Sequence, residues 1–595
     1  MTRILVFSPY ALWGIHTIYE ETIATACKAR GASVEYLLCD GLLPECDQHW
    51  DSKEDSSRPP DLCQRCRLQS KANLDRLGFP YQWLGEFVSD EQKLAILAWA
   101  EAVPPAELRR AFWQDSPIGE WVLSSVISYF RQYPPDIANS HVVDVYRGFL
   151  MSGAIVATGL CKYIADNAIN SAILFNGRQS ITRVAFEVFR QRGIPVLTHE
   201  RAEYLKGHVN VRSNAGCMNP EPFKAFWSKW AQIPLNRESL DATLKWLIQR
   251  RYGANLAWIP FNKSFAVDGN LRTRLNISKS KHLWALFTSS TDEVAGDPVM
   301  QGPYESQAAW VREVIQWVSL RDDVELIIKV HPNLAGNAYI GRATSEMQIF
   351  QQMAAALPVN VRIVMPDELV NAYSVADEAE VGLTFGSTIG LEMAMLGKPV
   401  LVASRAIYES SSSILAVQDR ELLPEMLEKC LHASTDRKIQ REAFRLAYYY
   451  IFKFELPFPA ITVQDIYRAE LNYINAGDLS AGKDDSLDRI CNFLISGLPL
   501  HNEPSSYDRL RTTADEDAFF EELANAPEYL VNTHYERWLK MKSLGRAVTG
   551  LLKRLPFGIG NTVLQVGRRS WHTVLNSFER GDNVPPQPRK SGEPK

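Results

Sequence analysis

Two stretches, LIIKVHPN (326–333) and EVGLTFGSTIGLEMAMLGKPVLV (380–402), decide the fold of this chain. The first predicts a short apolar strand that ends just before His331-Pro332. The second predicts a strand, a tight Gly386-Ser387-Thr388 turn, a short helix that ends at Gly397, and a further strand. In an open parallel sheet both loops fall at the carboxyl edge, which is where doubly wound folds bind their ligands.

The residue types at this edge favour a phosphate group. The Gly386-Ser387-Thr388 turn opens a helix, so its backbone N–H groups and hydroxyls face an incoming anion. His331, at the end of a neighbouring strand, can donate a hydrogen bond to the same phosphate, and Lys329 adds positive charge. The pattern therefore indicates a site for a nucleotide-activated sugar.

The order of these motifs also resembles a known family. His331-Pro332, then Gly386-Ser-Thr-x-Gly-x-Glu392, then Gly397-Lys398-Pro399 is similar to the nucleotide half of bacterial capsule-polysaccharide glycosyltransferases, which include the Kdo transferases of capsule export. CDP-glycerol transferases and sialyltransferases with a His-Pro motif are looser relatives. The specific match covers 326–402, with weaker similarity through the rest of the first 470 residues.

The resemblance implies an α/β protein of the GT-B fold, in which two Rossmann-like domains face a cleft. It implies transfer of a sugar from a nucleotide-activated donor, with a CMP-sugar such as CMP-Kdo favoured, to a bacterial surface-polysaccharide or glycolipid acceptor. It also implies that Glu392, one turn into the helix after the Gly-Ser-Thr turn, binds a ribose hydroxyl.

Size and composition set the outer limits. With 595 residues the chain is long enough for two or three domains, and 46% hydrophobic with 22% charged residues is typical of soluble globular proteins. The net charge of −5 gives no reason to expect a nucleic-acid partner. The first residues predict a strand rather than a signal peptide, and the most apolar window, 148–161, predicts a buried helix. We therefore expect a cytoplasmic protein.

The N-terminal part predicts a second Rossmann-like domain. An apolar strand over 3–8, a helix over 18–30 and a strand over 34–38 form a βαβ unit. The loop after the first strand lacks a Gly-x-Gly-x-x-Gly motif, so this domain is expected to face the acceptor rather than the nucleotide. His16 in that region is a candidate acceptor contact, with capping of the helix start as the alternative.

Three further residues point to the acceptor side. A strand that ends in Asn176-Gly177-Arg178, and a next strand that ends near Glu200, again resemble the acceptor-domain end of the capsule transferases. Asn176 and Arg178 are therefore candidate acceptor ligands. Glu200 is the candidate catalytic carboxylate, as a general base on an acceptor hydroxyl or as a stabiliser of an oxocarbenium-like transition state. A purely structural ion pair with an arginine is the alternative.

Two serine hydroxyls are further candidates for contact with the nucleotide-sugar donor. Ser289 and Ser290 follow the predicted strand 282–288 and are expected to contact a donor phosphate or sugar, with capping of the helix at 308–319 as the alternative. The candidate donor and nucleotide ligands are therefore Ser289, Ser290, Lys329, His331, Ser387, Thr388 and Glu392, and His331 is also a candidate catalytic residue. No Asp-x-Asp metal motif stands at the predicted carboxyl edges of the two sheets, so a divalent ion is not required for the proposed catalysis.

Four cysteines gather early in the chain, at Cys39, Cys46, Cys63 and Cys66. Their spacing ends in C-x2-C and fits a tetrahedral thiolate site, which predicts a structural zinc ion that orders the hydrophilic insert 39–66. An iron–sulfur cluster, or unligated or redox-active thiols, are the alternatives. The wider capsule family does not require this insert.

The chain beyond 475 predicts a helical extension that is split by charge. Its acidic stretch is 503–528, and a basic amphipathic stretch follows and ends in a polar, Pro-rich tail that is expected to be disordered. The basic part predicts contact with a membrane surface through 537–578, on the inner face of the plasma membrane, where a lipid-linked glycan acceptor would lie. The alternative is that it folds onto the acidic stretch.

These observations predict three regions and one leading function. The regions are an acceptor domain at 1–260, a nucleotide-sugar domain at 261–475 and the extension at 476–595. The leading function is glycosyl transfer between a nucleotide-sugar and a polysaccharide or lipid-linked glycan. One alternative is a CDP-alcohol glycerophosphotransferase-type polymer synthase, because the same phosphate-binding frame serves both. The other is a non-catalytic polysaccharide-assembly scaffold.

Overall fold

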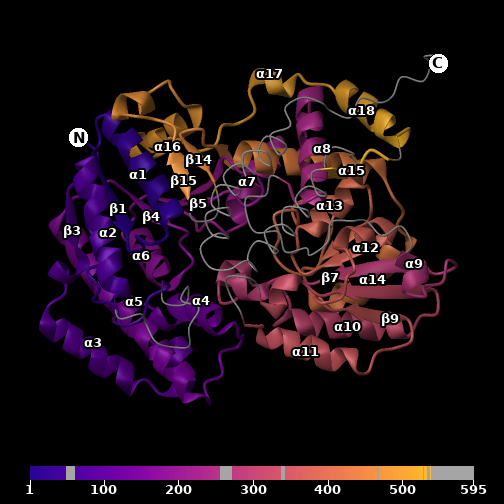
Figure 1. The fold of residues 1–595 in the computed structure, drawn as a ribbon, viewed down its shortest axis with the longest axis horizontal. Helices are drawn as coiled ribbons and strands as arrows, with labels where there is room; N and C mark the ends of the chain where they lie inside the picture. The colour runs from indigo at the N-terminus through magenta and orange to yellow at the C-terminus, as the bar shows by residue number, and fades with distance from the viewer. Residues whose placement is uncertain are drawn as a thin grey trace, which may run out of the picture.

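Two sheets with helices packed around them form the body of the protein in the computed structural model (Figure 1). The structure describes residues 1–48, 61–254, 271–336, 342–464, 468–526, 528–531 and 536–537. The basic stretch 537–578 lies outside the described residues except for its first residue, so its predicted membrane contact stays a prediction.

The first sheet has the strand order β13-β6-β5-β4-β1-β2-β3. Its first five strands in sequence are parallel, whereas β6 runs antiparallel to β5, and β13 antiparallel to β6. The strands are β1 (Arg3–Ser8), β2 (Ser33–Leu38), β3 (Tyr81–Trp83), β4 (Ser171–Phe175), β5 (Val196–Arg201), β6 (His208–Ser213) and β13 (Leu456–Pro457). The chain runs from β1 outward through β2 and β3 and then returns to the other side of β1 as β4, so the ligand-binding switch point of this sheet lies between β1 and β4.

The helices of the first domain pack around this sheet and on the chain that returns from the second domain. They are α1 (Gly14–Ala29), α2 (Leu62–Leu77), α3 (Asp90–Ala102), α4 (Ile118–Phe130), α5 (Ser140–Asp166), α6 (Ser180–Gln191), α7 (Glu221–Trp230) and α8 (Arg237–Arg251), with short 3-10 turns η2 (Leu84–Phe87) and η3 (Pro105–Arg110). In the described part of the chain α5 is the one helix long and apolar enough to cross a membrane, and 72% of its apolar window is buried inside the protein. It packs against α3, α4 and α6 and is a core helix, as its sequence predicts.

The second sheet is parallel throughout, with the order β12-β11-β10-β7-β8-β9. Its strands are β7 (His282–Phe287), β8 (Val324–Lys329), β9 (Val361–Val364), β10 (Val381–Thr384), β11 (Val400–Val402) and β12 (Leu415–Ala416). Its helices are α9 (Leu271–Arg274), α10 (Gln307–Ser319), α11 (Ser345–Ala354), α12 (Ala372–Glu378), α13 (Ile389–Met395), α14 (Leu423–His432) and α15 (Arg437–Tyr448). This is the strand order of a dinucleotide-binding fold, whose switch point lies between β7 and β10.

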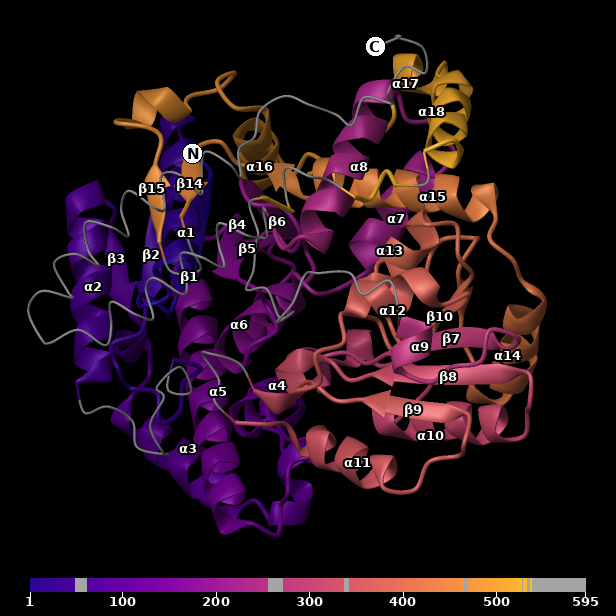
Figure 2. The same cartoon turned by 45° about the vertical axis from the view of Figure 1, so that its right-hand side comes forward.

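The chain then crosses back to the first domain. A π-helical turn, η8 (Tyr449–Phe454), leads into β13, which joins the first sheet at Leu456, earlier than the boundary at 475 that the sequence suggests. The hairpin of β14 (Ile461–Val463) and β15 (Ala469–Leu471) and helix α16 (Asp485–Ser496) follow. Helix α16 packs on α1, where Arg30 forms an ion pair with Asp488 at 2.5 Å. Figure 2 shows the two domains side by side, with this returning segment on the first. The predicted GT-B architecture is confirmed.

The acidic stretch after α16 packs on arginines of the two domains. It forms α17 (Ser506–Arg509) and α18 (Ala514–Ala524). The fully buried carboxylate of Glu516 lies 2.6 Å from the guanidinium of Arg445 in α15, and Glu522 lies 2.8 Å from Arg237 in α8. Acidic side chains of this stretch therefore form ion pairs with α8 and α15. The alternative, that the basic stretch folds onto the acidic one, concerns residues outside the described part of the chain.

Candidate active site between the two domains

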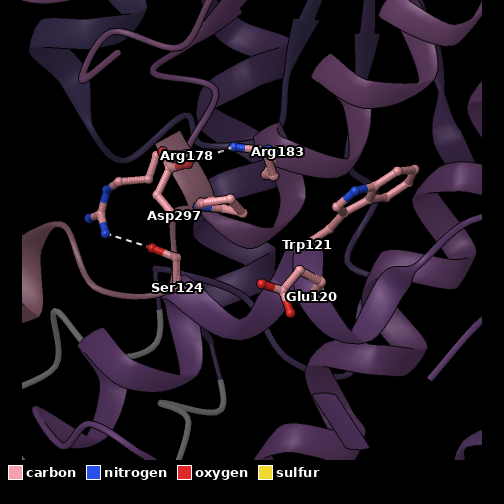
Figure 3. Close-up of a pocket in the computed structure, with 8 residues that line it drawn as sticks. Glu120, Trp121, Ser124, Arg178, Arg183 and Asp297 are labelled. Atoms are coloured by element: carbon pink, nitrogen blue, oxygen red, sulfur yellow. Dashed lines mark hydrogen bonds and ion pairs between the residues drawn. The ribbon is translucent and has the colours of Figure 1, made fainter. Parts of the chain in front are cut away.

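A pocket opens between the domains, with walls from both (Figure 3). Its lining residues are Glu120, Trp121 and Ser124 from α4, Arg178 and Arg183 around the start of α6, and Gly296, Asp297 and Pro298 from the segment after β7. The domains approach closely here: Arg183 pairs with Asp297 at 3.3 Å, and a Cβ on Gly296 would lie 2.8 Å from Ile127 and 3.1 Å from the backbone N of Ser124. Glycine at 296 is what allows this approach.

The candidate acceptor residues after β4 and β5 come together on one side. Asn176 (φ 56°) and Gly177 (φ 74°) form a left-handed turn that ends β4 sharply. The Asn176 amide donates to Glu200 Oε2, and its Oδ1 accepts from the backbone N–H of Arg178 at 2.9 Å. The Arg178 guanidinium donates to Ser124 Oγ at 2.6 Å, at the pocket wall. Glu200 is half-buried within β5, so the turn after β4 orients this carboxylate.

His16 lies beside the same edge. It is the third residue of α1, whose N-cap is Trp13, and its ring packs on Phe175 with the centroids 4.1 Å apart. Burial, reinforced by Arg201 and His199, lowers its pKa well below the usual histidine value. The imidazole is therefore neutral near neutral pH and sits at the end of β4, next to the candidate acceptor turn.

On the second domain, the loops after β7, β8 and β10 meet at the switch point. Ser289 Oγ donates to the Phe385 carbonyl at 3.2 Å and so bridges the ends of β7 and β10. Ser290 Oγ accepts from Asn333 Nδ2 at 2.6 Å and donates to Asp292 at 3.1 Å. Neither serine caps α10, because that helix is capped by Ser306. The two serines therefore bind neighbouring loops together at the edge where the donor is expected.

Burial and a backbone contact of the ring set the protonation state of His331. Its backbone N–H donates to Thr288 Oγ1 at 2.7 Å, and its ring Nδ1 accepts from the backbone N–H of Asn333 at 3.2 Å. Burial lowers the pKa of His331 to about 4; Asp292 raises it, while Lys329 and Arg131 lower it further. Since Nδ1 is an acceptor in a neutral ring, the proton resides on Nε2, which is a hydrogen-bond donor.

The amino group of Lys329 lies at the end of β9. It is buried and donates to the Met365 carbonyl at 3.3 Å. Its charge is near enough to His331 to help lower the pKa of that imidazole. The structure thus places the Lys329 amino group at the carboxyl edge of the second sheet, and its role at a donor phosphate stays a prediction.

The Ser387-Thr388 turn and Glu392 are held by an arginine of α8. The guanidinium of Arg250 lies 2.5 Å from the buried Glu392 carboxylate and donates to Thr388 Oγ1 at 3.1 Å. Ser387 is half-exposed, and its carbonyl accepts from Tyr408 at 2.5 Å. In the structure Glu392 binds Arg250, and its contact with a ribose stays a prediction.

Two arginines at the site were not predicted from the sequence. Arg250 brings a guanidinium to the turn that opens α13, and Arg131, at the end of α4, reaches across into the second domain. Arg131 has a left-handed backbone (φ 50°) and a fully buried side chain that donates to the Asn333 carbonyl at 2.7 Å. Neither stands in a motif, and each has its partner more than a hundred residues away in the chain, so no local signal identifies them.

The four candidate metal ligands lie behind this edge. Cys39 and Cys46 both lie in the loop after β2, and Cys63 and Cys66 are in the first turns of α2. None of the four forms a disulfide in the described part of the chain. Among the residues that the structure describes, no three side chains of His, Cys, Asp or Glu stand in a geometry that holds a metal ion.

Comparison with known proteins yields similarities of fold. No protein-family model matches the chain, and no curated protein matches it in sequence. Among solved structures it is similar to the Thermosulfurimonas dismutans KpsC beta Kdo 2,4 transferase, with 16% identity over 55% of this chain and 88% of that chain and a TM-score of 0.30.

Two further similar structures come from other enzymes. The S. aureus MnaA–UDP co-structure has 10% identity over 75% of this chain and 92% of its own, with a TM-score of 0.25. Acinetobacter baumannii MurG has 12% identity over 76% and 95%, also with a TM-score of 0.25. At such identities and TM-scores these similarities identify no substrate and no residue of the site.

Proposed function

We propose that the protein is a glycosyltransferase that moves a sugar from a nucleotide-activated donor to a bacterial surface-polysaccharide or glycolipid acceptor. One observation supports the proposal: two Rossmann-like domains, each with a ligand-binding switch point, meet at a pocket lined by both, and Arg178 at the carboxyl edge of the first sheet is part of its wall. Asn176 and Glu200 stand at one edge, and His331 and Thr388 at the other. Such edges are where doubly wound sheets bind ligands, so two substrates can meet between them.

Groups gathered at the switch point of the second sheet stabilise a leaving phosphate. The Nε2–H of the neutral His331 and the hydroxyls of Ser387 and Thr388 donate hydrogen bonds to its oxygens. The guanidinium of Arg250, 3.1 Å from Thr388, and the charge of Lys329 offset its negative charge. Prearranged donors of this kind lower the barrier by stabilising charge that develops in the transition state. The resemblance noted in the sequence favours a CMP-sugar such as CMP-Kdo as donor.

The first domain supplies the acceptor side. Glu200, oriented by Asn176, takes the proton from an acceptor hydroxyl as that oxygen attacks the anomeric carbon of the donor sugar. The bond between this carbon and the phosphate oxygen breaks, and the nucleotide leaves with the electron pair. Arg178 at the pocket wall and the neutral His16 position the acceptor. The remaining rate enhancement comes from holding the two substrates in line.

The proposal places the enzyme in the cytoplasm, where nucleotide-sugars are made, with a polysaccharide or lipid-linked glycan as acceptor. Contact of 537–578 with the inner face of the plasma membrane belongs to the same proposal, because a lipid-linked acceptor would lie there. The amphipathic basic pattern of that stretch supports it.

Calorimetric titration of the purified protein with CMP, CDP, UDP and GDP tests the proposal. We expect one nucleotide to bind, and His331→Ala to weaken that binding about tenfold or more. His432→Ala is the matched control, because its side chain is 75% exposed at the end of α14, away from the pocket. Absence of binding by all four nucleotides would reject the transferase site and favour a scaffold.

A second assay separates the two enzyme alternatives. The protein is incubated with the nucleotide-activated donor and an acceptor glycan, and the product is analysed by mass spectrometry. A mass increase equal to one sugar supports glycosyl transfer. An increase that includes a phosphate group supports a CDP-alcohol glycerophosphotransferase instead.

A further inference from the structure

The turn that carries His331 is built around its imidazole ring. His331 is the N-cap of the 3-10 turn η6 (Pro332–Ala335), and its ring Nδ1 accepts from the backbone N–H of Asn333 at 3.2 Å. A neutral imidazole has one acceptor nitrogen and one donor nitrogen, so this contact selects the tautomer with the proton on Nε2. The direction in which Nε2–H points therefore depends on how the backbone of Asn333 is held.

Asn333 is anchored from two sides. Its side chain is buried, and its amide donates to Ser290 Oγ at 2.6 Å, while the Ser290 hydroxyl donates to Asp292 at 3.1 Å. Its carbonyl accepts from the guanidinium of Arg131 at 2.7 Å. The first anchor lies in the loop after β7 of the second domain, whereas the second comes from the end of α4 in the first domain. Both domains therefore hold the backbone on which the His331 ring depends.

Arg131 makes three separate bonds to the second domain. Its Nε donates to Asp292 Oδ2 at 2.8 Å, its Nη1 to the Arg342 carbonyl at 2.8 Å, and its Nη2 to the Asn333 carbonyl at 2.7 Å. A planar guanidinium directs its donors along fixed lines, whereas a lysine ammonium is a point charge on a flexible stem. Arg131 is therefore suited to fix the geometry of the turn after β8 as well as to balance the charge of Asp292.

We propose that Arg131 and Asn333 are positioning residues, which hold the His331 ring in the tautomer and direction that present Nε2–H to the leaving phosphate of the donor. The inference rests on the proposed function, because it explains how His331 performs its role there. A donor that is fixed in place before the reaction stabilises developing charge without reorganisation. The nucleotide site of the second domain is therefore complete only when a side chain of the first domain is docked on it.

A double-mutant cycle on nucleotide binding tests whether Arg131 acts through His331. The wild type, Arg131→Lys, His331→Ala and the double variant are each titrated calorimetrically with CMP, CDP, UDP and GDP. Arg131→Lys keeps the positive charge beside Asp292 but loses the fixed fork, and we expect it to weaken binding about threefold or more. In the His331→Ala background the same change should have almost no further effect. Losses that simply add in the double variant would overturn the proposal.

Ser128→Ala is the matched control for this cycle. The Ser128 hydroxyl is also buried in α4 and donates to the backbone carbonyl of Asp292 at 3.3 Å, so its removal breaks a different bond between the same helix and the same loop. Nucleotide affinity should be unchanged in this variant. An equal loss of affinity in Ser128→Ala and Arg131→Lys would mean that general packing between the domains, and not the position of His331, is what Arg131 supports.

Nitrogen-15 NMR of the full-length protein labelled at histidine gives a readout that needs no nucleotide. The ring signals of His331 are identified as those that His331→Ala lacks. In the wild type at neutral pH we expect a single form with a protonated Nε2 and a bare Nδ1. Asn333→Ala and Arg131→Lys should each give a mixture of the two neutral tautomers.

A wild-type His331 ring with its proton on Nδ1 would overturn the proposal, and this measurement holds even if a variant fails to fold. The same single tautomer in both folded variants would also overturn it. Failure of all four nucleotides to bind, together with the expected NMR result, would reject the transferase site and leave the positioning of His331 intact. The two failures are therefore distinguishable.

Discussion

Arg131 of the first domain and Asp292 of the second form an ion pair at 2.8 Å whose guanidinium is fully buried. The same guanidinium donates to the carbonyl of Asn333, two residues beyond His331. One side chain from the end of α4 therefore holds both the loop after β7 and the loop after β8. The two edges of the proposed site keep their relative position through this contact.

Arg131→Ala should destabilise the protein strongly. Removing one partner of a buried ion pair leaves the other charge buried and uncompensated, at a cost of about 3–5 kcal/mol. Denaturant unfolding measures this cost. The double variant Arg131→Leu with Asp292→Leu should be less destabilised than the single one, because no charge remains buried.

The matched control for that pair is Lys162→Ala in α5. Lys162 pairs with Asp166, and both side chains are largely exposed, so the expected change is below about 1 kcal/mol. An Arg131→Ala variant as stable as this control would show that the interdomain ion pair contributes nothing to stability.

His331→Ala should lower turnover about tenfold or more while leaving the melting temperature nearly unchanged. The physical reason is the loss of one Nε2–H donor to the leaving phosphate. Steady-state kinetics and thermal unfolding of the same preparation measure the two effects. Normal turnover in a well-folded variant would contradict the proposal that His331 donates a hydrogen bond to the leaving phosphate.

The contribution of His331 should be insensitive to pH near neutrality. Its pKa is lowered to about 4, mainly by burial, so the ring stays neutral at higher pH. The ratio of wild-type to His331→Ala nucleotide affinity should therefore be constant between about pH 5.5 and 8. A ratio that changes with a midpoint near the ordinary histidine pKa would contradict this assignment.

Glu200→Gln should lower turnover by about a hundredfold or more, the scale of general base catalysis. The glutamine keeps an oxygen that accepts from Asn176 but cannot take a proton. Donor-nucleotide affinity, measured by titration, should be unchanged, because Glu200 belongs to the first domain. Equal loss of turnover and of nucleotide affinity would indicate a structural role for this carboxylate.

Glu455→Gln should flatten the dependence of stability on pH. Burial, reinforced by the charge of Glu203, raises the pKa of Glu455 from 4.5 to about 8. Between these values the folded chain binds more protons than the unfolded one, so the free energy of unfolding falls as pH rises from about 4.5 to about 8. Because glutamine does not titrate, the variant loses the part of this fall in the free energy of unfolding that is due to Glu455, on the order of a few kcal/mol between the two pH values.

Denaturant unfolding of both proteins at several pH values measures this difference. Arg212 and Tyr450 also interact electrostatically with Glu455, and they are the same in both proteins. Glu425→Gln, at an exposed position in α14, is the control and should keep the wild-type profile. A parallel profile in Glu455→Gln would mean that this carboxyl is ionised in the folded chain.

Local sequence predicted the elements that carry the site. Strand β8 ends two residues before His331, and α13 begins directly after the predicted Gly-Ser-Thr turn and ends two residues before Gly397. Apolar runs and Gly turns specify these limits locally. The antiparallel strand β6 and the return of β13 to the first sheet were not predicted. Strands so far apart in the chain pair without changing the local periodicity of apolar residues, so their pairing is not predicted from it.

The sequence by itself determined two Rossmann-like units and the residue types at their carboxyl edges, because strand and helix periodicity and the turn residues are local properties. Only the tertiary structure decided which charges those residues meet. Arg250 reaches Glu392 and Thr388, and Arg131 reaches Asp292, because domain packing brings their helices to the facing loops. The same packing buries His331 and lowers its pKa to about 4, since burial and nearby cations depend on the folded chain as a whole.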